Sequence, residues 1–230
     1  MDYKYEDIAG MIDHSLLQPN LADAELDEGC RVAAKYRVAS VCIKPYYVAR
    51  AAELLAGSGV AVGTTIGFPH GGHLTSVKIY ESERALDDGA KELDMVVNIG
   101  RVLAGNWNAV TREIGDIAKL AHARDGIVKV IFENGFLKDE QKIRLCQACV
   151  EARADYVKTS TGYGSSGATI EDLKLMRQHT PPHIGVKAAG GVRDLDMLLA
   201  VRAIGVTRVG ASKTVEMLEE CKKRLLCTNC

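Results

Sequence analysis

The sequence predicts a (β/α)8 TIM barrel, for three reasons. Eight short apolar runs resemble β-strands, and each is followed by a segment with the residue spacing of a helix. Alternating units of this kind form parallel strands joined by right-handed crossovers. The chain has 230 residues, near the size of a barrel of eight units, which favours closure over an open doubly wound sheet. No linker interrupts the series, so we expect residues 1–230 to form a single TIM-barrel domain.

Each predicted strand is a short apolar run of ordinary strand length. In chain order the runs are Met11–Leu17, Val38–Lys44, Ala61–Phe68, Glu92–Ile99, Ile127–Glu133, Ala154–Ser160, Ile184–Ala189 and Thr207–Gly210. Each predicted helix mixes apolar and charged residues at helical spacing. These segments are Ala22–Tyr36, Tyr47–Gly57, Ser76–Gly89, Asn108–Arg124, Asp139–Ala152, Ile170–His179, Leu195–Ile204 and Thr214–Leu225.

Composition narrows the partners that the chain can have. The sequence is 47% hydrophobic and 26% charged, with a formal net charge of −1. It has no basic tail and no one-sided block of charge, so we expect neither nucleic acid nor a membrane as a partner. The amino terminus is polar and acidic and no apolar span is visible, so we expect a cytoplasmic protein.

The cysteines indicate reduced thiols. There are seven, an odd number, which does not suit a disulfide framework. Two CxxC spacings, Cys146/Cys149 and Cys227/Cys230, could together form a four-thiolate zinc site. The first pair lies within a predicted helix and the second at the chain terminus, so we interpret Cys146 and Cys149 as buried apolar thiols. We expect no metal and no cofactor.

Two lysines in strand interiors are the candidate catalytic residues. Lys158 and Lys187 occupy corresponding points of two predicted strands, each just before a glycine-containing exit. Burial and a neighbouring cation both disfavour the charged form of a lysine, and the neutral amine is a nucleophile. Such an amine can form a Schiff base with a carbonyl, which then acts as an electron sink. The alternative is that the lysines extend to solvent at the strand ends.

The order of the motifs resembles that of the DeoC family of class I aldolases, and the resemblance covers nearly the whole chain. The segments that carry it are Ile12–Pro19, Val41–Pro45, Thr65–Gly71, Glu92–Gly100, Lys129–Glu133, Val157–Gly162, Gly185–Arg193 and Arg208–Ser212. The resemblance implies reversible cleavage of 2-deoxyribose 5-phosphate to glyceraldehyde 3-phosphate and acetaldehyde. It also implies a homo-oligomer, a dimer or larger.

The resemblance assigns roles at matching positions. Lys158 matches the Schiff-base lysine, Lys187 the lysine that activates it, and Asp94 the carboxylate that relays protons. A strand aspartate can equally be structural, pairing with a neighbouring cation. Asp13 and Ser15 share one face of the first strand and match positions that line the site, although the hydrogen bonding of the strand alone could also account for them.

Phosphate binding needs backbone amides and helix amino termini, which three strand exits can supply. The last exits of a barrel are where phosphates commonly bind. The candidate residues are Gly162, Gly190, Gly191, Val192, Arg193, Gly210 and Ser212.

The sequence also departs from the family pattern. Lys44 replaces a neutral residue and shares a strand face with Cys42, so we expect both side chains to contact substrate. Ala189, Asn134 and Lys213 are further departures. They leave two alternatives open: an aldolase of the same family acting on another aldehyde or sugar derivative, or a barrel that binds sugar phosphates without catalysis.

Overall fold

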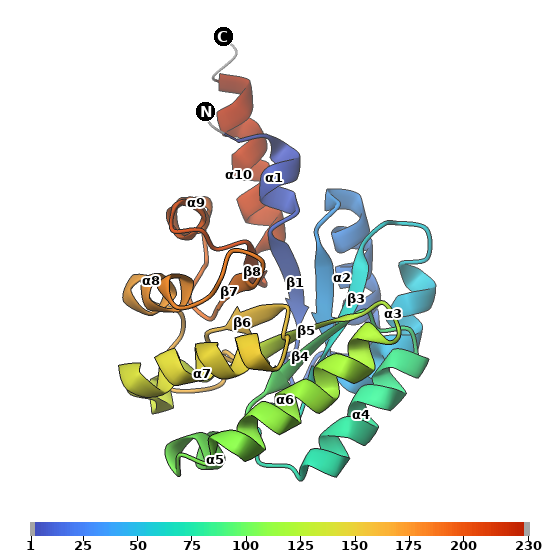
Figure 1. Cartoon of the computed structure of the whole chain (residues 1–230). Coiled ribbons are helices and arrows are strands. Elements are labelled where there is room, and N and C mark those ends of the chain that lie inside the picture. The colour runs from blue at the N-terminus through green and yellow to red at the C-terminus, as the bar shows by residue number, and fades with distance from the viewer. Residues whose placement is uncertain (1–2, 228–230) are drawn as a thin grey trace.

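The computed structural model describes residues 3–227 and contains a closed barrel of eight parallel strands (Figure 1). Each strand pairs with the next in the sequence, and the last strand pairs with the first. The strands are β1 (Ile12–Leu16), β2 (Ser40–Ile43), β3 (Ala61–Ile66), β4 (Glu92–Val96), β5 (Ile127–Ile131), β6 (Tyr156–Lys158), β7 (Gly185–Ala189) and β8 (Arg208–Ala211). The predicted TIM barrel is therefore confirmed.

Helices surround the strands on the outside of the barrel (Figure 1). They are α1 (Tyr5–Ala9), α2 (Asp23–Tyr36), α3 (Val48–Leu54), α4 (Thr75–Asp87), α5 (Ile99–Leu103), α6 (Trp107–His122), α7 (Asp139–Glu151), α8 (Ile170–Gln178), α9 (Leu195–Ala203) and α10 (Thr214–Cys227). Two short 3-10 turns, η1 (Pro45–Tyr47) and η2 (Asn134–Phe136), follow β2 and β5. None of the described helices is both long and apolar enough to span a membrane.

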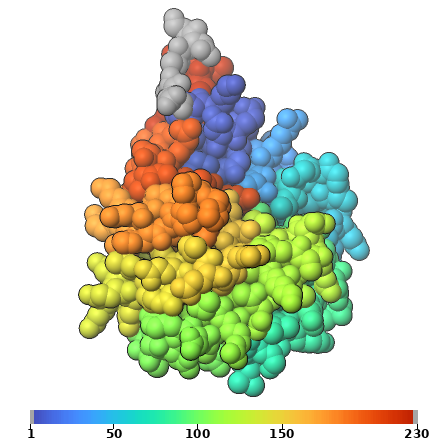
Figure 2. Space-filling view, in the orientation of Figure 1, coloured from blue at the N-terminus to red at the C-terminus, as the bar shows by residue number. Residues whose placement is uncertain are grey.

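Two helices, α1 and α5, were not expected from the sequence. Helix α1 packs against α10, and the Tyr5 hydroxyl donates to the Tyr36 carbonyl at 3.0 Å. Helices α1 and α10 thus lie side by side at one end of the molecule (Figure 2). Helix α5 begins where the predicted fourth strand still continued, because the Asn98 side chain caps it by accepting the Arg101 amide. The strand ends at Val96, short of the expected Ile99.

Alternation along the strands separates an apolar outer layer from a polar interior. In β4, Glu92 and Asp94 alternate with Leu93 and Met95, and all four are buried. The apolar side chains belong to the hydrophobic core, whereas the carboxylates contact basic side chains of β5 to β8 across the barrel. The interior of this barrel therefore holds charge.

The expected thiols of α7 are confirmed as buried: Cys146 and Cys149 are both enclosed, and burial raises the pKa of Cys146 to about 12. Cys227 is exposed at the end of α10, and Cys230 lies outside the described residues. In residues 3–227 no group of three or more His, Cys, Asp or Glu side chains is placed to hold a metal ion.

Candidate active site

Lys158 and Lys187 are neighbours on adjacent strands, as predicted. They are direct partners in the register between β6 and β7. Both amines contact one and the same oxygen, because each Nζ lies 2.7 Å from Asp94 Oδ2. All three side chains are almost completely buried. The barrel thus brings together the three residues that the sequence singled out from three separate strands.

A second layer of charges lies beneath this group, and sequence reasoning missed most of it. The Lys129 amine of β5 is 3.2 Å from Asp94 Oδ1 and 2.8 Å from Asp13 Oδ2. Arg208 of β8 forms ion pairs with Asp13 and with Glu92, and Glu92 also contacts Lys129. The available signal was a charged residue within a short apolar run, Lys129 in the middle of β5 and Arg208 at the start of β8, where a buried strand is normally apolar.

Asp13 belongs to this second layer, which corrects its assignment as a substrate-binding residue. Its carboxylate is fully buried and lies 2.5 Å from the Lys187 amine. It faces the barrel interior as expected, but one step deeper than Ser15, because successive inward positions along β1 lie at different depths. Its contact is with Lys187, below the cavity that Ser15 lines.

The two lysines have opposite pKa directions. Burial lowers the pKa of Lys158, and the cationic Lys187 lowers it further against the attraction of Asp94. Burial alone would also lower the pKa of Lys187, but the carboxylates of Asp13 and Asp94 more than offset this and raise it. Lys187 therefore stays protonated at a pH where Lys158 more readily gives up its proton.

Asp94 remains ionised despite its burial. Burial raises the pKa of this carboxyl, but Lys129, Lys158 and Lys187 together hold it well below its usual range. The buried cluster contains the four bases Lys129, Lys158, Lys187 and Arg208 and the three acids Asp13, Glu92 and Asp94. Its charges balance when Lys158 is neutral, which is the state that a buried cluster favours.

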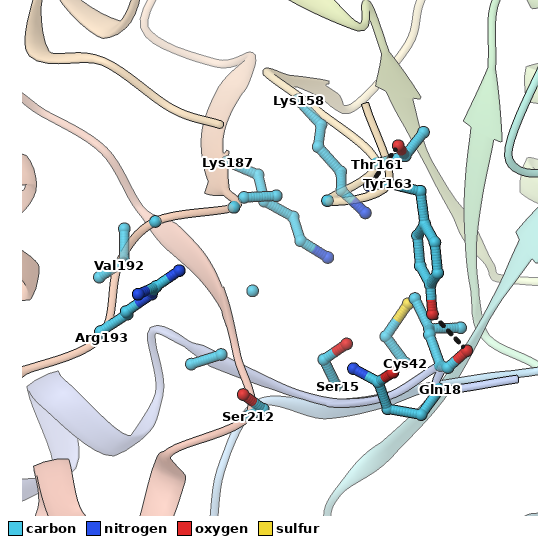
Figure 3. A pocket seen from close by; sticks show the side chains of 17 residues that line it. Ser15, Gln18, Cys42, Lys158, Thr161, Tyr163, Lys187, Val192, Arg193 and Ser212 are labelled. Atoms are coloured by element: carbon cyan, nitrogen blue, oxygen red, sulfur yellow. Dashed lines mark hydrogen bonds between the residues drawn. The ribbon is translucent and has the colours of Figure 1, made fainter. Parts of the chain in front are cut away.

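A cavity of about 310 Å3 opens above the two amines at the carboxyl ends of the strands (Figure 3). Most of the predicted binding residues line it: Ser15, Cys42, Gly162, Gly190, Gly191, Val192, Arg193, Gly210 and Ser212. Lining residues that the sequence did not predict as binding residues are Leu17, Gln18, Thr161, Tyr163, Ala189 and Ala211. We call this space the central cavity.

One end of the central cavity suits an anion. We call Gly190–Arg193 and Gly210–Ser212 the anion end. The first segment follows β7, and the second covers the end of β8, just ahead of the 14-residue helix α10. Gly190 and Gly191 have φ of +76° and +101°, which glycine adopts at little cost because it has no Cβ. The Arg193 guanidinium is exposed and points toward the cavity (Figure 3). Backbone amides, a helix amino terminus and a cation together match a phosphate group.

Cys42 lies at the cavity floor as a neutral thiol. Its Sγ is 3.8 Å from Asp94 Oδ2. Burial, followed by the negative charge of Asp94, raises the pKa of Cys42 to about 11. The thiol is therefore a wall of the cavity and a poor nucleophile at neutral pH.

Lys44, expected to contact substrate, does not line the central cavity. Strand β2 ends at Ile43, so the alternation that placed Lys44 beside Cys42 no longer holds. The Lys44 amine instead donates to the carbonyls of Gln18, Pro19 and Leu21 at 3.0, 3.2 and 2.9 Å. These carbonyls belong to the loop after β1, and a cation is a strong donor for such a cluster.

The other departures lie at different distances from the chemistry. Ala189 lines the central cavity, whereas Lys213 is exposed beside it and does not line it. Asn134 is buried in η2 and its amide contacts the Met176 sulfur at 3.4 Å. Asn134 is thus a packing residue.

Comparisons with known proteins identify the family of this chain. The family model described as DeoC/LacD family aldolase matches residues 8–212. A curated deoxyribose-phosphate aldolase of Rhodopirellula baltica is 59% identical over 224 residues, covering 97% of this chain and 93% of its own. One of a Geobacillus species is 47% identical, covering 92% and 95%. A solved deoxyribose phosphate aldolase of Aeropyrum pernix, described as tetrameric, has a TM-score of 0.89 at 32% identity, covering 96% and 93%.

Proposed function

The chain belongs to the DeoC/LacD family of aldolases, and we propose that it reversibly cleaves 2-deoxy-D-ribose 5-phosphate through a Schiff base on Lys158. The products are D-glyceraldehyde 3-phosphate and acetaldehyde. The observation that carries this proposal is the pair of buried lysines that share one oxygen of Asp94 and have opposite pKa directions. A protein that only bound sugar phosphates would have no use for a lysine with a lowered pKa.

The reaction begins with the neutral amine of Lys158. Its nitrogen attacks the C1 aldehyde of the open-chain sugar, and protonation of the resulting hydroxyl from solvent followed by loss of water leaves an iminium ion. The phosphate lies at the anion end, where Arg193 and the glycine backbone hold it. The substrate is thereby fixed at both ends, so that C2 and C3 lie over the lysines.

Cleavage of the C2–C3 bond then follows. The C3 hydroxyl gives its proton to a water that Asp94 orients, because the Asp94 carboxylate itself lies beneath the cavity floor. The bonding electrons move into the iminium and form an enamine, and glyceraldehyde 3-phosphate leaves. Protonation of the enamine at C2 and hydrolysis release acetaldehyde and restore Lys158. Lys187 stays charged throughout because Asp13 and Asp94 pair with it.

We also propose a homo-oligomer, a dimer or larger, acting in the cytoplasm. The description of the Aeropyrum pernix relative as tetrameric supports an assembly. The described cysteines are all free thiols, and unpaired thiols suit a reducing compartment. Size-exclusion chromatography with light scattering of the purified chain tests the assembly, and a monomer at all concentrations would contradict it.

A direct assay tests the proposed reaction. We expect the purified protein to release acetaldehyde from 2-deoxyribose 5-phosphate, with equal rates before and after EDTA treatment, because the Schiff base already supplies the electron sink. Lys158→Met is the inactive control. Loss of activity on EDTA that zinc restores would contradict the Schiff-base route. Turnover of another aldehyde or sugar derivative, with none of deoxyribose 5-phosphate, would show a different substrate.

A further inference from the structure

Tyr163 stands between the central cavity and two further cavities. An outer cavity of about 580 Å3 is walled by Pro69, Ile99, Phe136 and Tyr163 among others, and a second one, of about 400 Å3, by Phe68 and Tyr163. Tyr163 lines all three spaces. We call the Tyr163 side chain, which is 44% exposed at the mouth of the barrel, the partition.

The Tyr163 side chain is held in this position from both ends. Its hydroxyl donates to the Leu17 carbonyl, in the loop after β1, at 2.7 Å. Its ring meets the Phe68 ring edge-on, with the ring centres 5.5 Å apart and an interplanar angle of 88°. The tyrosine thus reaches from the exit of β6 to the exits of β1 and β3. A ring anchored at three strand exits is a fixed wall.

The backbone of Tyr163 is fixed as well. Its amide donates to Thr161 Oγ1 at 3.0 Å, and both the amide and the hydroxyl of Thr161 donate to the Glu133 carboxylate. Glu133 is 2% exposed and has a φ of +56°, a left-handed conformation that is unusual for a residue with a side chain. This chain of contacts ties the loop that carries the partition to the end of β5.

The partition lies opposite the anion end of the central cavity. Figure 3 shows Tyr163 on one side and Arg193 on the other, with Lys158 and Lys187 between them. A sugar phosphate whose phosphate is at Arg193 and whose C1 is on Lys158 has its C1 and C2 end nearest Tyr163. The floor below is closed by the buried Cys42 and Asp94. A substituent on C2 would therefore extend toward the ring of Tyr163.

We propose, on the basis of the function proposed above, that Tyr163 is a specificity-determining residue that restricts the donor aldehyde to acetaldehyde. In the synthetic direction the enamine carbon of the donor attacks the aldehyde carbon of glyceraldehyde 3-phosphate. The oxygen of that aldehyde takes up a proton from the water that Asp94 orients and becomes the C3 hydroxyl. A longer straight-chain aldehyde places its alkyl group on the attacking carbon, where it meets the partition. The space beyond has apolar walls at Pro69, Ile99 and Phe136, so it suits an alkyl group once the ring is removed.

Competition between donors tests the proposal. The ratio of kcat/KM for propanal to that for acetaldehyde is measured with glyceraldehyde 3-phosphate as acceptor. We expect this ratio to rise about 10-fold or more in Tyr163→Ala, since one methylene in a fitted pocket changes specificity by at least that factor. Tyr163→Phe keeps the ring and should raise it much less. Tyr80→Ala is the matched control, because Tyr80 is an exposed tyrosine on α4 that lines none of these three cavities.

The outcomes separate this inference from the proposed function. A ratio in Tyr163→Ala within 2-fold of the wild-type ratio contradicts the role of Tyr163 in donor specificity and leaves the proposed aldolase function unaffected. A wild-type protein that makes no product from acetaldehyde overturns the proposed function itself. If circular dichroism shows that Tyr163→Ala is unfolded, Tyr163→Leu carries the same test, because it also removes the ring and its contact with Phe68.

Discussion

At the scale of single residues, two identical side chains on adjacent strands acquire different chemistry from their partners. Lys187 contacts two buried carboxylates, Asp13 and Asp94, and keeps its proton. Among residues 3–227, the ion-pair partner of Lys158 is the Asp94 oxygen that it shares with Lys187, and burial dominates its pKa. One additional carboxylate therefore keeps Lys187 protonated, whereas Lys158 can act as the nucleophile.

This difference predicts a shift in pH dependence. In Lys187→Met the repulsion on Lys158 disappears and Asp94 Oδ2 pairs with Lys158 without a competing amine, and both changes raise the pKa of Lys158. Because turnover needs the neutral amine, the acid limb of the pH profile of kcat/KM should move to higher pH, and kcat should fall about 10²- to 10⁴-fold. The exposed Lys119→Met on α6 is the control. An unmoved acid limb would mean that burial alone sets the pKa of Lys158.

The sequence was sufficient to predict that Lys158 and Lys187 are neighbours, because a lysine inside an apolar strand is conspicuous, and the resemblance to the DeoC family added Asp94. It was not sufficient to predict their support. Lys129 lies in an equally apolar strand, but its partners Asp13 and Glu92 come from other strands, and only the register places them within reach. Lys44 does not line the central cavity beside Cys42, because the strand alternation used to place it ends one residue earlier, at Ile43.

At the scale of elements, the loops at the carboxyl ends shape the site and are themselves held by buried or cationic side chains. The loop after β6 is tied to Glu133, and the loop after β1 to Lys44. Prediction of the elements was correct for all eight strands and for the eight long helices, but their ends differ by a few residues. The five-residue helices α1 and α5 were missed because one turn of helix carries too little periodicity to recognise.

The loop after β1 gives a prediction about stability. Lys44→Met leaves the carbonyls of Gln18, Pro19 and Leu21 without their shared cationic donor. We expect the free energy of unfolding to fall by about 1–2 kcal/mol, as for a partly buried charged hydrogen bond. The ratio of activities on different aldehydes should stay the same, because the amine does not line the central cavity. Urea denaturation tests the stability and a panel of aldehydes tests the specificity. A changed order of substrates would show that Lys44 does affect substrate preference.

At the scale of the whole molecule, closure of the barrel creates the active site. Asp13, Asp94, Lys129, Lys187 and Arg208 lie on five different strands and meet only because β8 pairs with β1. The apolar alternate positions pack beneath the helices and leave the interior to the charged cluster. The fold class followed from the sequence because a strand and helix pattern repeats along it. The exact depth of each interior residue depends on the stagger of the strands, which no single segment encodes.

The most direct test of this account is to trap the Schiff base. Sodium borohydride added together with acetaldehyde reduces an imine to a stable secondary amine. Intact-mass measurement and peptide mapping should then find one added ethyl group per chain, on Lys158. The Lys158→Met variant should take up none, and Lys187→Met should take up less at neutral pH. An ethyl group found only on Lys187, or none on either lysine while cleavage of deoxyribose 5-phosphate continues, would contradict the assignment of Lys158 as the nucleophile.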